Sequence, residues 1–299
     1  MCRVIYINFS SFVRMLGQLG NWCLPVLFRL CSEAYSISTD FEKLARSLNR
    51  AFTACLTDRS ADNVSKRMGT MYIANLIFKV NSKLNQSSAS IVKAMSASDL
   101  PKLYKFPKSH QVTFSYYTGL MQFLEGKYES SEAKFNFALE NCLHSETNLK
   151  KILLFLIPLK MLNGILPCQS LLDRFDLQLY SQLISTIRIG DLHNFNRLLD
   201  CNESELLKIQ TFSIFEKMIF LCQRNFVKRV FLLLNKETKI ALKFLTFGSD
   251  LDSVECMLAN LISFGFIRGY LSHERSFLVL SAKEPFPKNF KLAFNNALQ

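Results

Sequence analysis

The part of the sequence that most constrains the fold lies between residues 239 and 281. Its apolar residues at 240–245 repeat at helical spacing, and Gly248 ends that repeat. Ser249 or Asp250 can then cap a second helix, because either side chain can accept a hydrogen bond from a free N–H group of the first turn. This part of the chain therefore predicts two short helices joined by a turn.

A pair of strands is expected after the second helix. That helix covers 251–262 and ends at Gly265, where the missing Cβ lets the backbone take a left-handed turn. Two short β-prone runs, 266–271 and 277–280, are joined by the polar turn 272–276 and so predict a hairpin. Helix, turn, helix and hairpin in this order make a winged helix.

The segment 112–143 predicts a helical hairpin of the tetratricopeptide type. Small Ala residues on its second helix are expected to let the two helices approach closely. One such hairpin cannot bury both of its faces, so it predicts neighbours of the same kind stacked as a right-handed solenoid. The apolar positions are Phe114, Tyr117, Leu120 and Leu124 on the first helix and Ala133, Phe137 and Ala138 on the second, with Gly126 in the turn.

Apolar residues at helical spacing continue over most of the chain, and only ten Gly and seven Pro occur among its 299 residues. We therefore expect a mostly α fold, a tetratricopeptide-like right-handed helical solenoid that continues into the C-terminal winged helix. Further helices are expected over 22–35 with Pro25 in the first turn, after the caps Asp40 and Asp62, over 148–163, on both sides of Gly190 within 170–199 with Asp191 as a cap, and over 209–222 and 226–234.

These elements divide the chain into five parts. Residues 1–20 show no clean period and receive no element. N-terminal helical repeats are expected over 21–108, a further helical part over 109–236, the winged helix over 237–284 and a tail over 285–299. Because only residues 235–238 separate the last solenoid helix from the winged helix, we expect the two to dock rigidly.

The formal net charge of +12 is spread along the chain rather than gathered in one element. Residues 236–299 contain eight basic and six acidic residues, so the winged helix is only slightly basic. The densest basic loop lies elsewhere and contains Lys102, Lys105 and Lys108. This loop is either a solvated loop or a rim that tracks phosphates, and the sequence leaves both possibilities open.

No pattern typical of a metal site, a membrane span or a catalytic centre occurs. The nine Cys include no Cys-x-x-Cys pair, so we expect no metal or cofactor, and buried thiols in a reducing compartment. The most apolar run, 152–159, is much shorter than the roughly 20 residues of a membrane span. Gly-x-Ser-x-Gly and phosphate-loop motifs are absent, and Asp173 and Asp176 are expected to be solvated or capping residues. We therefore expect no enzyme.

A helical stack that runs directly into a C-terminal winged helix resembles a PCI domain, the module shared by subunits of the proteasome lid, the signalosome and translation-initiation factor three. The step from Arg188 to Leu192, followed by Phe195 and Leu199, resembles the Gly-Asp-Leu turn of that family. Several strings resemble the PCI domain-containing protein 2 family more closely, over about residues 22–287 but weakly at 36–60. They lie at 21–26, 156–162, 224–230, 255–262, 269–273 and 285–287.

The resemblance implies a non-enzymatic scaffold subunit of a nuclear-pore-associated, transcription-coupled mRNA export complex. Its implied location is the nucleus and the nuclear pore, with the cytoplasm also open. The implied hetero-oligomer contains a large PCI-bearing scaffold protein and a small acidic disordered subunit, contacts no membrane, and binds RNA or DNA without sequence specificity. An acidic partner agrees with the charge of +12. Relative to the family the chain begins inside the N-terminal helical region, so we expect the first helices to be missing or replaced by residues 1–20.

If the winged helix contacts nucleic acid, we expect contacts to phosphates rather than to bases. No Lys or Arg occurs over 252–264, so the second helix offers only Ser253 and Asn260 to a base edge. Alternatively, the nearby cations are solvated or pair with Glu255 and Glu274. The candidate phosphate-binding residues are Lys239 and Lys243 on the first helix, Arg268 on the first strand, and His273 and Arg275 on the wing.

Two further alternatives concern aromatic residues and the identity of the complex. Tyr116, Tyr117, Phe123 and Tyr128 can in principle stack on bases, but at this helical spacing we expect them in the core. The chain can also be a PCI scaffold of a signalosome-, proteasome-lid- or initiation-factor-like complex that does not bind nucleic acid. Several such subunits carry a long helix after the winged helix, whereas 12 residues follow Pro287 here, which favours the export subunit.

Overall fold

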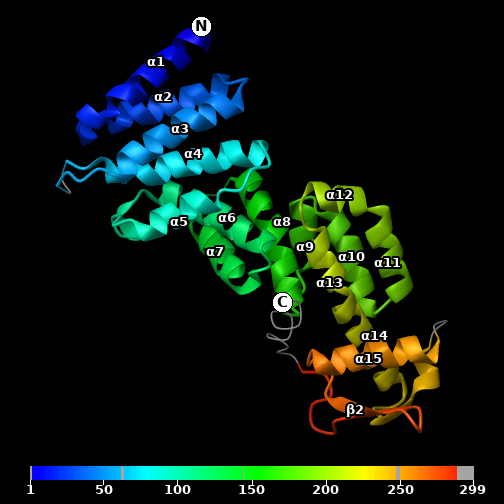
Figure 1. The fold of residues 1–299 in the computed structure, drawn as a ribbon. Coiled ribbons are helices and arrows are strands. Elements are labelled where there is room, and N and C mark those ends of the chain that lie inside the picture. The colour runs from blue at the N-terminus through cyan, green and yellow to red at the C-terminus, as the bar shows by residue number, and fades with distance from the viewer. Residues whose placement is uncertain (1, 62–63, 144, 247–249, 288–299) are drawn as a thin grey trace. The chain divides into compact units, whose positions relative to one another are not determined.

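The computed structural model describes residues 2–61, 64–143, 145–246 and 250–287 (Figure 1). Within them the protein is mostly α-helical and contains one three-stranded sheet near the C-terminus. The chain forms two compact units. Unit 1 consists of residues 1–125 and 129–145, and unit 2 of residues 126–128 and 146–299.

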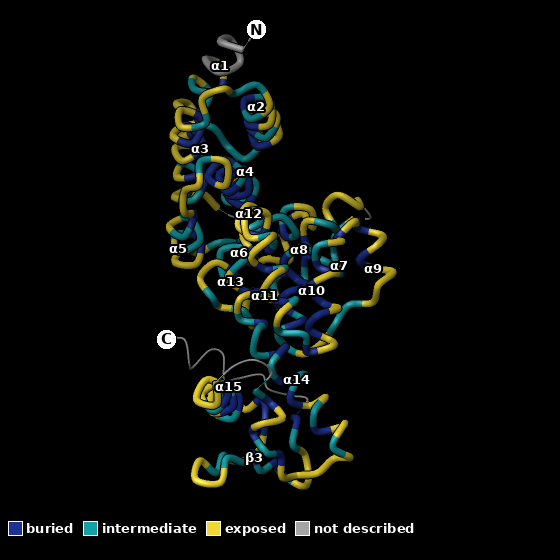
Figure 2. The backbone as a smooth tube through the Cα atoms, turned by 90° about the vertical axis from the view of Figure 1, so that its right-hand side faces the viewer, coloured by how far each residue is buried: buried dark blue, intermediate teal, exposed yellow. Residues whose placement is uncertain are grey.

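Unit 1 is a series of helices, and apolar residues from its first helix to the segment before the sixth α-helix form one core. That core extends from Phe9 in the first helix to Phe106 before the sixth, and it appears as the dark blue inner sides of the helices in Figure 2. The helices are α1 Cys2–Met15, η1 Leu16–Gln18, η2 Asn21–Cys23, α2 Leu24–Ile37, α3 Phe41–Leu56, η3 Lys66–Gly69, α4 Thr70–Lys83, α5 Ala89–Ala97, η4 Leu103–Lys105, α6 Lys108–Leu124 and α7 Tyr128–Asn141.

The N-terminal segment, which the sequence leaves unassigned, forms α1 and η1. Phe9 and Leu16 are fully buried and Val13 is 8% exposed, so one face of this segment is part of the core of unit 1. These residues are four and three positions apart, which is helical spacing. Polar neighbours such as Asn8 and Ser11 interrupt the run and hide that period in the sequence.

Local signals place the next helices correctly. Pro25 lies in the first turn of α2, and the Asp40 carboxylate accepts a hydrogen bond from the Lys43 N–H at 3.0 Å, which caps α3. Asp62 lies outside the described residues, and the helix expected after it is α4, which begins at Thr70. The predicted apolar stripe of α4 is buried, namely Met71, Ile73, Leu76, Ile77 and Val80.

The predicted hairpin of α6 and α7 is present, with Gly126 at φ +74° in the turn. Of the two Ala residues predicted to allow close approach, Ala138 is fully buried and Ala133 is exposed. Gly119 of α6 also contacts α7 closely, since a Cβ on it would lie 3.1 Å from the Cβ of Lys134. The Ser131 hydroxyl also donates a hydrogen bond to the Gly119 carbonyl at 2.8 Å.

The helical part of unit 2 agrees with the sequence up to residue 201 and differs beyond it. Gly164 and Gly190 end helices at φ +77° and +80°, and the Asp191 carboxylate caps α11 by accepting a hydrogen bond from the Asn194 N–H at 3.0 Å. The helices are α8 Glu146–Leu162, α9 Gln169–Arg174, α10 Gln178–Ile189, α11 Leu192–Cys201, α12 Glu203–Lys208, α13 Phe212–Lys217 and α14 Ile219–Leu233.

The predicted helices over 209–222 and 226–234 are wrong in their boundaries. Gln210, at φ +59°, separates α12 from α13, whereas α14 continues without a break through residues 223–225. The polar side chains inside α14 are tolerated because they have partners. Arg224 donates to the carbonyls of Phe286 and Pro287, and the Asn225 amide donates to the Ile187 carbonyl at 2.8 Å.

The C-terminal part of unit 2 is a winged helix with strand order β1-β3-β2, all antiparallel. Its elements are β1 Lys239–Ala241, η5 Leu242–Phe244, α15 Leu251–Ser263, β2 Gly269–Ser272 and β3 Phe277–Leu280. The helix predicted over 240–245 is therefore wrong. Ile240 pairs with Leu278, and a partner so distant in sequence leaves no trace in the local period.

The first helix of the winged helix is α14. It packs against α10 and α11 of the helical stack and also against α15, so both parts share it. Phe220 of α14 lies 5.1 Å from the ring of Phe264 and 6.4 Å from that of Phe266. Gly248 and Ser249 lie outside the described residues, whereas Asp250 caps α15 by accepting from the Ser253 N–H at 3.2 Å.

The end of α10 is fixed to α14 by hydrogen bonds. A helix leaves its last carbonyl groups without partners within the helix. Side chains of α14 supply partners here, because Asn225 donates to the Ile187 carbonyl and Arg229 to the Ile189 carbonyl at 3.4 Å. Gly190 is required at this contact, since a Cβ on it would lie 2.4 Å from the Phe226 nitrogen.

Candidate nucleic-acid interface

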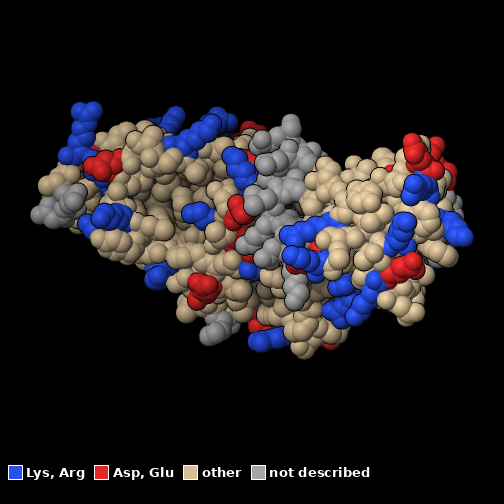
Figure 3. Space-filling model, turned by 90° about the horizontal axis from the view of Figure 1, so that it is seen from below, with Lys and Arg blue, Asp and Glu red and all other residues tan. Residues whose placement is uncertain are grey.

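The sheet of the winged helix has one buried face and one open face, because side chains alternate along each strand. Ile240, Leu278 and Leu280 on the buried face are at most 4% exposed. In Figure 1 the sheet lies below α15, and Figure 3, seen from below, shows basic side chains interspersed with tan and acidic ones on that side. The open face, defined by the strand register, consists of Lys239, Ala241, Tyr270, Ser272, Phe277 and Val279.

Three of the five predicted cations lie at the end of the sheet where β3 begins. The Lys239 ammonium lies 5.6 Å from the ring centroid of Phe277, the first residue of β3. Arg275 and Lys243 are brought near each other by a hydrogen bond between their chain neighbours. The Leu242 N–H donates to the Ser276 carbonyl at 3.0 Å. Within the described part of the chain, Lys239, Lys243 and Arg275 form no ion pair, so we call them the free cations.

The other two predicted cations are paired with carboxylates. The Arg268 guanidinium lies 2.6 Å from the Glu284 carboxylate, immediately before β2. His273 Nδ1 lies 2.7 Å from Glu255, and this hydrogen bond raises the pKa of His273, with the attraction of the same carboxylate as the next cause. Pairing with Glu255 was one alternative left open by the sequence, and it holds for His273.

Helix α15 presents no cation to a nucleic acid. Its exposed residues are Leu251, Asp252, Ser253, Cys256, Ala259, Asn260 and Ser263. The Asn260 amide lies 3.9 Å from the Cys256 sulfur of the previous turn. A helix with this surface does not attract phosphates into a groove, so phosphate contact falls to the free cations.

The second basic group lies in unit 1, around η4. Lys102 caps η4, Lys105 ends it, and Lys108 is the first residue of α6. The Lys108 ammonium donates to the side-chain carbonyl of Asn141 at 3.3 Å and lies 5.6 Å from the ring of Phe137. Lys108 is thus held against α7.

The aromatic residues of α6 are core residues, as expected. Phe123 is 5% exposed, and the rings of Tyr116 and Phe135 lie 5.9 Å apart edge to face. Burial raises the pKa of Tyr116 to about 12 and also raises the pKa of Tyr117. Tyr128 lies 4.8 Å from the Lys217 ammonium and is also packed.

Asp173 and Asp176, which the sequence assigns to a solvated face or a cap, have different partners in the structure. Asp173 accepts hydrogen bonds from Gln169 and Gln178, whereas Asp176 lies outside α9 at φ +50° and pairs with Lys150 at 3.4 Å. No group of three or more His, Cys, Asp or Glu residues among those described could hold a metal ion. No described helix has both the length and the apolar character needed to cross a bilayer.

The eight cysteines whose side chains the structure describes are all free. Cys23, Cys31, Cys55 and Cys222 are buried, and burial raises the pKa of Cys55 and of Cys222 to about 12. The expectation of buried thiols is wrong for the three exposed ones. These are Cys168, Cys201 and Cys256.

The sequence did not identify the open face of the sheet as a candidate contact surface. It predicts the two strands of the hairpin but assigns Lys239 to a helix, which leaves the orientation of this side chain undefined. A signal was present in the alternation over 277–280, where Phe277 and Val279 share one face and Leu278 and Leu280 the other. The third strand, needed to complete the surface, came only from the structure.

Comparison with known proteins supports the family. No family model matches the sequence. The protein CSN12 homolog of Schizosaccharomyces pombe is 36% identical over 97% of this chain and 76% of its own length. The PCI domain-containing protein 2 homolog of Drosophila melanogaster is 31% identical over 93% of this chain and 76% of its own length. Enhanced ethylene response protein 5 of Arabidopsis thaliana is 29% identical over 95% of this chain and 76% of its own length.

The sequence matches agree with the fold, because a PCI domain is a helical stack followed by a winged helix and the structure contains both parts. The matched share of the chain includes the solenoid helices as well as the winged helix. The names of these relatives point to a PCI-domain scaffold subunit. The chain therefore belongs to the family of PCI domain-containing protein 2 and CSN12 homologues.

Proposed function

We propose that this PCI scaffold subunit acts in a nuclear-pore-associated, transcription-coupled mRNA export complex, in which its winged helix contacts nucleic acid together with a partner subunit. The proposal places the protein in the nucleus and at the nuclear pore. The observation that carries it is the position of Lys239, Lys243 and Arg275 beside one end of the sheet without a carboxylate partner among the described residues.

The expected contact is to phosphates and is independent of sequence. The exposed side of α15 carries Asp252 and no Lys or Arg, so it offers only Ser253 and Asn260 to base edges and no positive charge to phosphates. Cations that neutralise phosphates release counterions, and affinity then falls steeply with salt. Three cations make a small footprint, which fits a surface that a second subunit completes.

The proposed partners are a large PCI-bearing scaffold protein and a small acidic disordered subunit. The net charge of +12 suits an acidic partner, because opposite charge accelerates encounter and disfavours wrong partners. The diffuse distribution of this charge is compatible with a partner that extends over several helices.

Co-expression with these two proteins tests the proposal. We expect a soluble ternary complex in size-exclusion chromatography that shifts single- and double-stranded probes alike. The double variant Lys239→Glu with Arg275→Glu is expected to weaken both shifts about tenfold or more, and to flatten the salt dependence.

Arg268→Gln provides the matched control. Because Arg268 is paired with Glu284, its neutralisation is expected to affect the shift less than Lys239→Gln. Unchanged affinity in the double variant would remove the free cations from the footprint. Purification with signalosome- or proteasome-lid-type PCI subunits, and no shift of any probe, would favour the alternative scaffold.

A further inference from the structure

We propose that the open face of the winged-helix sheet is a platform on which single-stranded nucleic acid stacks its bases, with Tyr270 and Phe277 as the stacking side chains. The inference rests on the proposed function, that the winged helix contacts nucleic acid. It goes further by naming the strandedness of the ligand and the side chains that meet its bases.

The two aromatic residues are neighbours on one face. Tyr270 of β2 pairs with Val279 of β3, so Phe277 is its diagonal neighbour, with about 7–8 Å between such positions. Tyr270 is 62% exposed and Phe277 is half-buried, so Tyr270 exposes more of its side chain to solvent than Phe277 does. Two neighbouring positions of this face carry the small side chains of Ala241 and Ser272.

Cations accompany these rings. Lys239 lies on the same face opposite Val279, with its ammonium 5.6 Å from the Phe277 ring centroid. Arg275 lies in the turn two residues before Phe277. None of the six side chains of the open face is acidic, and the nearest acidic residues in sequence are Glu237 and Glu274, both exposed. Aromatic rings beside cations are the combination with which proteins bind single strands, since bases stack on the rings and phosphates meet the cations.

The buried face of the same sheet explains why the platform is rigid. Ile240, Leu242 and Leu278 are fully buried beneath it, and Gly269 allows β2 to approach β3 closely. A Cβ on Gly269 would lie 2.2 Å from the Val279 carbonyl oxygen. The position of Tyr270 relative to Phe277 is thus fixed before any ligand binds, which lowers the entropic cost of binding.

A duplex does not use such a platform, because its bases are already stacked and paired. It can still contact the free cations through its phosphates. Loss of Tyr270 should therefore weaken single-strand binding and leave duplex binding unchanged. Loss of the cations should weaken both.

Titration of the full chain with a labelled oligouridylate, and with the same strand in a duplex, separates these effects by fluorescence anisotropy. Tyr270→Ala is expected to weaken single-strand binding about tenfold and to leave the duplex unaffected. Tyr270→Phe retains a ring and should bind as the unaltered chain does. Tyr270→Leu retains apolar area without a ring, so it should bind as weakly as Tyr270→Ala.

A spectroscopic readout locates the contact. Trp22 is the only tryptophan and lies in unit 1, 68% exposed, so Trp22→Phe removes it without opening the core. Adding Tyr270→Trp then places the single tryptophan on the platform. We expect its fluorescence to be quenched by the single strand and to stay constant with the duplex.

Several outcomes overturn the inference. They are no binding of the oligouridylate at about 50 mM salt by the unaltered chain either alone or in the ternary complex, equal single-strand binding by Tyr270→Ala, and full binding by Tyr270→Leu. If Tyr270→Ala and Tyr270→Leu instead reduce recovery of the ternary complex with RNA binding intact, the face docks a protein. If Tyr270→Ala is silent while Lys239→Glu with Arg275→Glu weakens binding by the ternary complex, the platform fails and the proposed function stands.

Discussion

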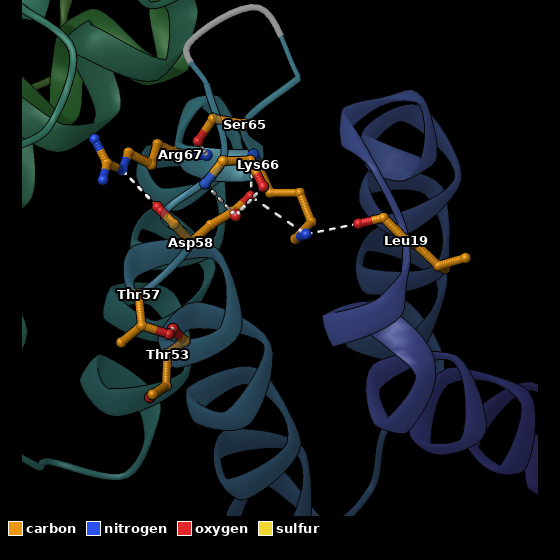
Figure 4. A network of polar contacts seen from close by, with 8 residues as sticks. Leu19, Thr53, Thr57, Asp58, Ser65, Lys66 and Arg67 are labelled. Carbon is orange, nitrogen blue, oxygen red and sulfur yellow. Dashed lines mark hydrogen bonds and ion pairs between the residues drawn. The ribbon is translucent and has the colours of Figure 1, made fainter.

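The ion pair of Lys66 and Asp58 fixes the loop after α3 in unit 1 (Figure 4). The ammonium and carboxylate lie 3.3 Å apart, with side chains only 5% and 7% exposed. Lys66 also donates from its ammonium to the Leu19 carbonyl at 2.6 Å and from its backbone N–H to Asp58 at 2.7 Å. Arg67 donates to the Asp58 carbonyl at 2.8 Å. The pair thus connects the chain after η1 to the chain before α4.

Removing one charge of this pair is expected to destabilise the protein strongly. Lys66→Met should lower the free energy of unfolding by about 3 kcal/mol or more, because Asp58 stays buried without its partner. Lys66→Met combined with Asp58→Asn should recover part of this loss. Lys43→Met, at the exposed pair with Asp40, is the control and should leave the urea midpoint nearly unchanged. A similar midpoint for both single variants would contradict the prediction.

The same carboxylate predicts a dependence of stability on pH. Burial alone would raise the pKa of Asp58, but hydrogen bonds from Lys66 and Ser60 outweigh it and hold this pKa well below its usual range. The stabilisation is therefore present above the unfolded pKa of about 3.9 and is lost as the pH falls below it. Urea midpoints should decline below about pH 4, and less steeply in Asp58→Asn. Parallel declines in both proteins would assign the acid sensitivity to other groups.

The junction of α10 and α14 shows how one element connects the helical stack to the winged helix. Gly190→Ala should destabilise the protein by at least about 2 kcal/mol, because the position combines a positive φ with a backbone neighbour at 2.4 Å. Gly126→Ala shares the positive φ but has open space around it, and should cost only about 1 kcal/mol. The difference between the two, measured by urea denaturation, isolates the contact with α14. Equal losses would exclude that contact as the cause.

Arg224 fixes the segment after β3 to α14. It is 7% exposed and donates to the carbonyls of Phe286 at 3.3 Å and Pro287 at 3.0 Å. Phe286 packs against Phe231 of α14 with ring centroids 5.6 Å apart. The same segment caps the start of β2, since the Arg268 N–H donates to the Pro285 carbonyl at 2.9 Å.

Arg224→Met should release this segment. The substitution retains apolar bulk but leaves two carbonyls without their donor, at an expected cost of about 2 kcal/mol or more. The Arg268 amide should then exchange hydrogen faster, whereas amides in the middle of α15 should keep their protection. Unchanged exchange at Arg268 would show that the segment is held without Arg224.

At the scale of the whole molecule, the charge of +12 is diffuse, and two basic groups in different units are candidates for phosphate contact. Replacing the free cations Lys239, Lys243 and Arg275 by Gln should lower the slope of log affinity against log salt by about 2 for a single strand. The matched variant replaces Lys102, Lys105 and Lys108 by Gln. If the loop around η4 is only solvated, this variant leaves the slope unchanged. A slope lowered by the second variant alone would place the phosphate contact in unit 1.

Much of the fold could be predicted from interactions between residues that are close in the sequence. Asp40, Asp191 and Asp250 cap helices because their carboxylates meet N–H groups within three residues, and Gly126 and Gly190 take left-handed turns for reasons internal to their own backbone. The Gly-Asp-Leu turn, which resembles that of PCI domains, together with the order of the elements, predicted the family. Such signals need no knowledge of distant residues.

Features that depend on distant partners could not be predicted in this way. The apolar residues at 240–245 have helical spacing, yet the chain at 239–241 is a strand because β3 lies beside it. Helix α14 continues through Arg224 and Asn225 because carbonyls from other elements accept their hydrogen bonds. The same holds for the site, since only packing separates the free cations from Arg268 and His273, which meet carboxylates 16 and 18 residues away. Periodicity and caps are properties of neighbouring residues, whereas pairing between strands and between charges is decided by which segments fold together.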